Sequence, residues 1–225
     1  MEAERRERGT EGWRLAAWAA LVGFLIVLGY GSRVQGGDPP DDALYRYETA
    51  VGGILVYGVL LAILLWIAHG TSQREFFALR RPESWPGALG LAAVAYVAIF
   101  VGAGLLLIAL DAGDEQGLTP DAWDSSKAGA YAANFVSVAL VGPIVEELMY
   151  RGAGMTLLAR FGAPVAAIVT AICFGLGHGL VLALAALILF GLVTAWLRLR
   201  TDSVYPCMVV HCAFNATSLI AAVAT

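Results

Sequence analysis

The stretch Val141-Gly-Pro-Ile-Val-Glu-Glu-Leu-Met-Tyr-Arg151 places two adjacent carboxylates and an arginine in the middle of an apolar segment. This segment runs from about Ala128 to Arg160, which is longer than the roughly 20 residues that a membrane-spanning helix needs. A charged side chain at the centre of a bilayer costs about 3 kcal/mol or more, so such residues are rare and mark functional sites. Glu146, Glu147 and Arg151 are therefore the first candidates for a functional site.

The composition predicts an all-α integral membrane protein. Of the 225 residues, 59% are hydrophobic and 14% are charged, whereas soluble domains carry about 25% charged residues. The net charge of −4 gives no support for nucleic-acid binding, and we expect no nucleic-acid partner. Cys173, Cys207 and Cys212 lie apart in apolar segments without a CxxC spacing, so they read as buried core residues.

Apolar segments along the chain predict a bundle of about seven transmembrane helices. The first is too long for a signal peptide and no cleavage site follows it, so it reads as an uncleaved span. The fifth is short, and a glycine-rich turn at 175–179 separates it only weakly from the sixth. We treat 1–225 as a single integral membrane domain, with three N-terminal helices and their loops in 1–127. The segments are Trp13–Tyr30, Thr49–Ala68, Gly87–Leu110, Ala128–Arg160, Ala163–His178, Leu180–Leu197 and Val204–Ala224.

Basic residues are divided unevenly between the two sides of this bundle. An excess of Lys and Arg marks the cytoplasmic loops, so the N-terminus is predicted to be cytoplasmic and the C-terminus to lie on the opposite side. The preference for arginine over lysine and the richness in Ala and Gly indicate a GC-rich genome, and we expect the membrane to be a prokaryotic plasma membrane. Three basic residues, Arg33, Arg46 and Lys127, flank the poorer side. The richer side holds Arg5, Arg6, Arg8, Arg14, Arg74, Arg80, Arg81, Arg160, Arg198 and Arg200.

Polar residues on three of the predicted helices are expected at a similar depth. With a rise of about 1.5 Å per residue, Glu146 lies roughly 21 Å from the cytoplasmic end of its helix and His178 roughly 22 Å from the start of its own. His211 and Asn215 lie about 13 Å and 20 Å into the last helix. These groups are therefore expected to meet near the middle of the membrane.

Local spacing adds detail to this picture. Residues four apart share one face of a helix, so Arg151 reads as the counterion of Glu147 and leaves Glu146 without that partner. Gly142-Pro143 removes one helix hydrogen bond and is expected to bend the backbone toward a cavity. The glycines at 175, 177 and 179 permit a close approach of the backbone or form a cavity wall.

Taken in order on successive apolar segments, these residues resemble the CPBP family. The resemblance is carried by Glu146-Glu147-x-x-x-Arg151, Phe174-x-x-x-His178 and His211-x-x-x-Asn215, and Phe190-Gly191 is compatible with a weaker intervening motif. It covers 128–225, which we read as a CPBP-like catalytic core, whereas the first three helices resemble nothing in particular. The family contains type II CAAX prenyl endopeptidases and the bacteriocin-processing or self-immunity proteins often called Abi.

The resemblance implies an intramembrane endopeptidase that hydrolyses a membrane-associated peptide or protein tail within the lipid bilayer. Glu146 would activate a water molecule held by His178, and two donors from the last helix would stabilise the oxyanion. Arg151 and Phe174 would support the site. The implied catalytic set is Glu146, Glu147, His178, His211 and Asn215.

Two alternatives stay open. Two histidines and one glutamate match a catalytic zinc set, so a divalent metal such as zinc could be held by Glu146, His178 and His211. The absence of a local HExxH pair and the asparagine near the second histidine favour a mechanism without a cofactor. The non-enzymatic alternative is an immunity or scaffold protein or a proton-coupled carrier, although the inverted repeats common in carriers are not seen.

Overall fold

The chain is an all-α integral membrane protein, and its architecture comes from a computed structural model. The structure describes residues 2–36, 40, 42–113, 115 and 122–224, with side chains described from residue 12 onward. Among these residues every regular element is a helix, and six helices are long and apolar enough to cross a membrane. The helix α8 (Ala163–Gly177) is apolar but has only 15 residues. The expected bundle of about seven helices thus consists of six spans and this shorter helix.

The helices follow the predicted segments with limits that differ by a few residues, except at the start of α1. The short helix α3 was not expected. In chain order the α-helices are α1 (Glu2–Val34), α2 (Tyr47–Ile67), α3 (Gln73–Phe76), α4 (Trp85–Ala109), α5 (Ala128–Val136), α6 (Gly142–Glu147), α7 (Met155–Leu158), α8 (Ala163–Gly177), α9 (Leu184–Thr201) and α10 (Tyr205–Ala224).

The fourth span is one continuous helical stretch of 37 residues, Ser125–Phe161, whose α-helical winding is interrupted by two π-helical turns. Two π-helical turns, η3 (Ser137–Val141) and η4 (Leu148–Gly154), bracket α6. Pro143 has no N–H to bond back along the helix, and η3 ends directly before the Gly142-Pro143 pair. Such π turns occur frequently at functional sites. The bend expected at Gly142-Pro143 is therefore observed as a π turn directly before it. The helix that follows this turn, α6, carries both Glu146 and Glu147.

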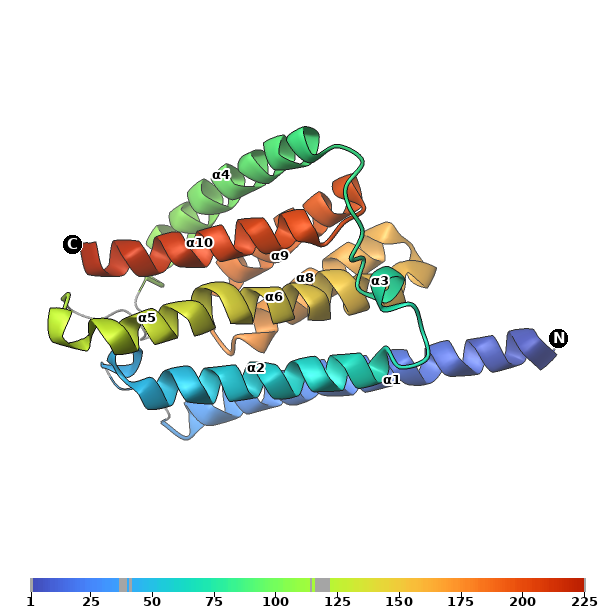
Figure 1. Cartoon of the computed structure of the whole chain (residues 1–225), viewed down its shortest axis with the longest axis horizontal. Coiled ribbons are helices and arrows are strands. Elements are labelled where there is room, and N and C mark those ends of the chain that lie inside the picture. The colour runs from blue at the N-terminus through green and yellow to red at the C-terminus, as the bar shows by residue number, and fades with distance from the viewer. Residues whose placement is uncertain (1, 37–39, 41, 114, 116–121, 225) are drawn as a thin grey trace.

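Helix α9 lies at the centre of the packing, against α8 on one side and α4 on the other (Figure 1). A Cβ atom added to Gly191 would lie 2.7 Å from the Cα atom of Ala171, so α8 and α9 approach to backbone contact. Small residues permit this approach between membrane helices. Large apolar side chains such as Leu55 and Ile108 point outward and are 64% and 81% exposed. They face the position that lipid chains occupy in a bilayer.

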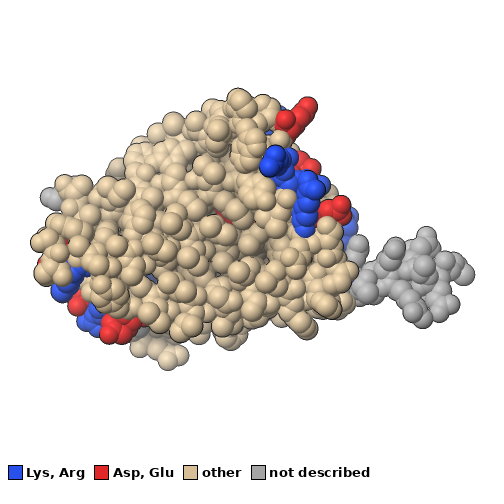
Figure 2. Space-filling view, in the orientation of Figure 1, with Lys and Arg blue, Asp and Glu red and all other residues tan. Residues whose placement is uncertain are grey.

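Charged side chains gather at the two ends of the bundle and leave an apolar surface between them (Figure 2). At the end nearer the N-terminus, Arg80 pairs with Asp202 at 3.3 Å, and Arg81 lines one surface cavity with Arg200 and another with Arg74. The two marked chain termini lie at opposite ends of the bundle (Figure 1).

At the opposite end, Arg33 pairs with Glu115 at 3.4 Å, and Lys127 lies over the ring of Tyr45. The two sets of basic residues that the topology prediction rests on are therefore at opposite ends. The side chains of Arg5, Arg6 and Arg8 lie outside the described residues. Which end faces the cytoplasm stays a prediction.

Candidate functional site

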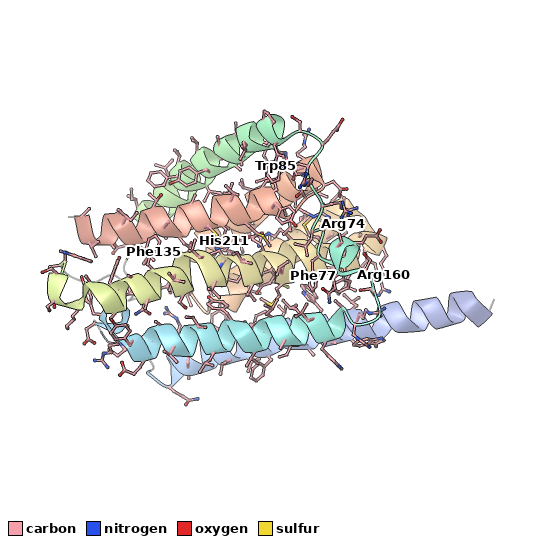
Figure 3. The ribbon with its side chains drawn as sticks, in the orientation of Figure 1. Arg74, Phe77, Trp85, Phe135, Arg160 and His211 are labelled. Atoms are coloured by element: carbon pink, nitrogen blue, oxygen red, sulfur yellow. The ribbon has the colours of Figure 1, made fainter. Side chains whose placement is uncertain are left out.

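Polar residues from α6, from the C-terminal end of α8 and from α10 meet about halfway along the bundle, as their spacing predicted. His211 lies between the two charged ends (Figure 3). The cavity at this point has a volume of about 280 Å³. Its polar lining is formed by Tyr57, Glu146, His178, His211, Asn215 and Ser218. The predicted meeting of Glu146, His178, His211 and Asn215 is observed, while their chemical roles stay predictions.

Glu146 reaches this cavity with a side chain that is 16% exposed. One carboxylate oxygen, Oε1, accepts a hydrogen bond of 3.0 Å from the hydroxyl group of Tyr57. The other, Oε2, lies 3.8 Å from Nε2 of His211. The carboxylate therefore lacks an arginine partner, as predicted. Its two neighbours, Tyr57 and His211, lie on other helices, and the spacing within its own segment did not predict them.

Glu147 points away from the cavity into the protein interior. Its Oε1 lies 2.9 Å from Nδ1 of His211 and 3.4 Å from Nη1 of Arg151, and the side chains of Glu147 and Arg151 are both 0% exposed. The predicted pair with Arg151 is present, whereas the contact with His211 was missed. Because Glu147 holds one ring nitrogen of His211, the other nitrogen is directed toward Glu146.

Arg151 connects the helix of the two carboxylates to α9. Its guanidinium group donates a hydrogen bond of 3.2 Å to the carbonyl oxygen of Gly191 and a second one to the hydroxyl group of Thr194. The same group lies 4.6 Å from the ring centroid of Phe174. The structure therefore gives Arg151 and Phe174 a joint packing position directly behind the site.

His178 directly follows the last residue of α8 and is tied to the preceding turn. Its Nδ1 lies 2.8 Å from the carbonyl oxygen of Phe174. A carbonyl oxygen only accepts hydrogen bonds, so Nδ1 carries a proton and Nε2 is left for the cavity. The Phe174 ring packs against both imidazoles, with centroid distances of 4.7 Å to His178 and 5.6 Å to His211.

Asn215 lies one helical turn beyond His211 on α10. Its side-chain amide donates a hydrogen bond of 2.9 Å to the carbonyl oxygen of Val138 in the π turn η3. Winding the backbone as a π turn changes which carbonyl groups are available, and here one of them orients the amide. The second amide hydrogen of Asn215 is not used by this bond.

The loop after His178 is fixed from two sides. A Cβ atom added to Gly179 would lie 2.8 Å from the backbone carbon of Gly29 on α1, so the two backbones touch. The carboxylate of Glu115 accepts hydrogen bonds of 2.7 Å from the N–H groups of both Val181 and Ala183. Burial disfavours the charged form of Glu115, but these N–H groups and nearby Arg33 outweigh it and lower the pKa of the carboxyl group. Through the contact of Gly29 with Gly179 and the ion pair of Arg33 with Glu115, the N-terminal helix α1 helps to position His178.

Replacing Gly179 by alanine is expected to lower the melting temperature in detergent. Its φ of +67° is strained for a residue with a side chain, and the new methyl group would meet the backbone of Gly29. Overpacking of this kind costs about 1–3 kcal/mol. Gly90→Ala is the matched control, because nothing lies within 4 Å of its Cβ position. Equal melting temperatures for the two variants would contradict the contact with α1.

The metal alternative can be compared with the positions of the side chains. Among the described residues, no group of three or more His, Cys, Asp or Glu side chains is placed to hold a metal ion. Glu146, His178 and His211 share the cavity, and Nδ1 of each histidine bonds to a protein oxygen, which leaves Nε2 on the cavity side. Metal-ligating histidines commonly have this arrangement, so whether the site holds a metal ion stays a prediction.

One comparison with known proteins finds a match. Residues 128–217 match a family model described as type II CAAX prenyl endopeptidase Rce1-like. The matched range begins at the first residue of α5 and ends beyond Asn215, so it includes all of the residues that carry the motifs. No curated protein and no solved structure matches the chain. The chain is thus similar, over residues 128–217, to the type II CAAX prenyl endopeptidases of the Rce1-like family, and this match agrees with the resemblance to CPBP proteases.

Proposed function

We propose that this protein is an intramembrane endopeptidase that hydrolyses a peptide bond in a membrane-associated peptide or protein tail. The observation that carries the proposal is a single cavity, halfway along an apolar bundle, lined by a carboxylate, two imidazoles and a carboxamide. The family match supports the same class of reaction. Burial of four such groups together in lipid is costly, which favours a chemical role over a structural one.

The first step is the activation of a water molecule by Glu146. The free carboxylate oxygen of Glu146 and Nε2 of His178 each accept one hydrogen bond from the water. The lone pairs of the water oxygen then remain available to attack the carbonyl carbon of the peptide. As the new C–O bond forms, the proton passes to Glu146, which acts as a general base.

The negative charge that develops on the carbonyl oxygen is stabilised from α10. When protonated, His211 donates from Nδ1 to Glu147 and from Nε2 toward the cavity, and Asn215 donates its second amide hydrogen. A donor of this kind contributes about 3–4 kcal/mol in soluble hydrolases. When the intermediate collapses and the C–N bond breaks, Glu146 returns its proton to the leaving amine. Glu147 contributes by holding His211.

We propose that this reaction needs no metal or other cofactor. In favour of this, no three His, Cys, Asp or Glu side chains of the described residues are placed to hold a metal ion. Protein oxygens orient the two imidazoles instead, through Nδ1 of His178 to Phe174 and Nδ1 of His211 to Glu147. Both rings are then oriented by protein groups alone. We further propose that the end of the bundle rich in arginine faces the cytoplasm and that the bilayer is a prokaryotic plasma membrane.

The test is a hydrolysis assay on the protein in liposomes, with a library of peptides that carry apolar or lipid-modified tails, in ¹⁸O-labelled water. Wild type is expected to yield two fragments with one ¹⁸O atom in the new carboxylate, in the presence of a chelator as well. His178→Ala is expected to yield none. The control is His69→Ala, which alters an exposed histidine after the end of α2. Folded wild type without product would favour the non-catalytic alternative, and activity lost to a chelator and restored by zinc would overturn the metal-free mechanism.

A further inference from the structure

Tyr57 lies in the middle of α2, outside the segment that matches the family model. Most of its neighbours on this helix face outward, and Val56 and Val59 are 55% and 59% exposed. Tyr57 instead is half-buried and turned toward α6. Its hydroxyl group donates the 3.0 Å hydrogen bond to Oε1 of Glu146. A helix that otherwise presents apolar side chains to lipid thus delivers one polar group to the candidate base.

Tyr57 also lies between two cavities. The cavity of about 280 Å³ on the side of α10 is paired with one of about 220 Å³ on the side of α1 and α2. Three residues, Tyr57, Glu146 and His178, line both of them. The partition between the cavities is therefore formed by the candidate base, the candidate water-holding histidine and this tyrosine.

The fourth span is shaped to receive the tyrosine ring. A Cβ atom added to Gly142 would lie 2.7 Å from both Cζ and Oη of Tyr57. Gly142 and Glu146 are four residues apart and share one face of α6. The missing side chain at Gly142 makes room for the ring, and the carboxylate one turn later receives its hydroxyl group.

We propose that Tyr57 is a positioning residue that holds the carboxylate of Glu146 in the orientation needed to activate water. By occupying Oε1, it leaves Oε2, the oxygen 3.8 Å from His211, as the one that accepts the proton. This inference rests on the proposed function. It adds to it that the working site includes α2 and is incomplete within residues 128–217.

The experiment compares the kinetics of three variants in liposomes with those of wild type. Tyr57→Phe keeps the ring and removes only the hydroxyl group, and Gly142→Ala pushes the ring away from Glu146. Both are expected to lower kcat about 10- to 100-fold with little change in KM, since a small misplacement of a reacting group costs up to about 100-fold. The control is Tyr96→Phe, which removes a 2.8 Å hydrogen bond between the half-buried Tyr96 on α4 and Thr217 on α10. It is expected to keep the wild-type kcat.

A second measurement follows the hydrogen bond without relying on turnover. The infrared carboxylate band assigned to Glu146, by difference from Glu146→Gln, is expected to shift in Tyr57→Phe and to stay in place in Tyr96→Phe. If wild type hydrolyses peptide but Tyr57→Phe keeps its kcat or its carboxylate band, the inference is wrong and the proposed function stands. If folded wild type hydrolyses no peptide, both the positioning role of Tyr57 and the proposed function are wrong. This holds even if the carboxylate band shifts in Tyr57→Phe, because such a shift shows only the hydrogen bond between Tyr57 and Glu146.

Discussion

The Glu146→Gln variant is expected to hydrolyse peptide about 1,000-fold more slowly than wild type while unfolding at the same temperature. Glutamine has the size of glutamate and can still accept the hydrogen bond from Tyr57, so the packing around α6 is kept. Its amide oxygen is far too weak a base to take a proton from water. Glu146 makes no ion pair with an arginine, and His211 keeps Glu147 as its partner at 2.9 Å, so no buried charge is left unpaired. The measurements are kcat in liposomes and the melting temperature in detergent.

The control for this prediction makes the same chemical change elsewhere. Glu48→Gln replaces an exposed glutamate in the first turn of α2 and is expected to leave both quantities unchanged. If Glu146→Gln retained more than about a tenth of the wild-type rate, Glu146 would not be the general base, because this role contributes at least about 100-fold. A large drop in melting temperature would show instead that Glu146 holds the helices together.

The depth of the site could be predicted from the sequence because it depends on distance along each helix. A fixed rise per residue places Glu146, His178 and His211 at similar depths, whatever the rotation of the helices. The cost of polar groups in lipid then restricts them to the interior of the bundle. The i,i+4 pair of Glu147 and Arg151 was predictable for the same reason, since it lies within a single helix.

Contacts between helices depend on how each helix is rotated, and the sequence does not state this. The hydrogen bond from His211 to Glu147, rather than to Glu146, is one example. The π turns η3 and η4 are another, because a change of winding by one residue leaves no distinct pattern in an apolar stretch. The end of α8 at Gly177 and the start of α9 at Leu184 also differ from the predicted limits, since the glycines there permit several backbone conformations.

Tyr57 left one usable signal. Tyrosines of membrane proteins gather at the two interfaces, whereas Tyr57 is ten residues from both Tyr47 and Ile67, the ends of α2. That is roughly 15 Å from either end of the helix. A hydroxyl group at this depth needs a hydrogen-bond partner. A tyrosine in the middle of a span therefore points to a polar site on a neighbouring helix.

The Arg151→Met variant is expected to lose about 3–5 kcal/mol of unfolding free energy. Arg151 and Glu147 are both 0% exposed, with 3.4 Å between Nη1 and Oε1. Removing the arginine leaves the buried carboxylate of Glu147 without its guanidinium partner and with only the hydrogen bond from His211. It also removes the hydrogen bonds to Gly191 and Thr194 that connect the fourth span to α9. Denaturant unfolding in detergent micelles measures the difference.

An exposed ion pair of the same spacing provides the control. Arg46 and Asp42 are also four residues apart, but their side chains are 48% and 42% exposed. Water solvates the remaining partner there, so Arg46→Met is expected to cost less than about 1 kcal/mol. A loss in Arg151→Met as small as that in Arg46→Met would mean that burial of the Glu147 pair does not matter for stability.

The double variant Glu147→Gln/Arg151→Met separates the charge from the packing. If the penalty of Arg151→Met comes from an unpaired buried carboxylate, replacing this carboxylate by a neutral amide should restore part of the lost stability. The hydrogen bonds to α9 stay lost, so the recovery is expected to be incomplete. A double variant no more stable than Arg151→Met would place the whole effect in the contacts with Gly191, Thr194 and Phe174.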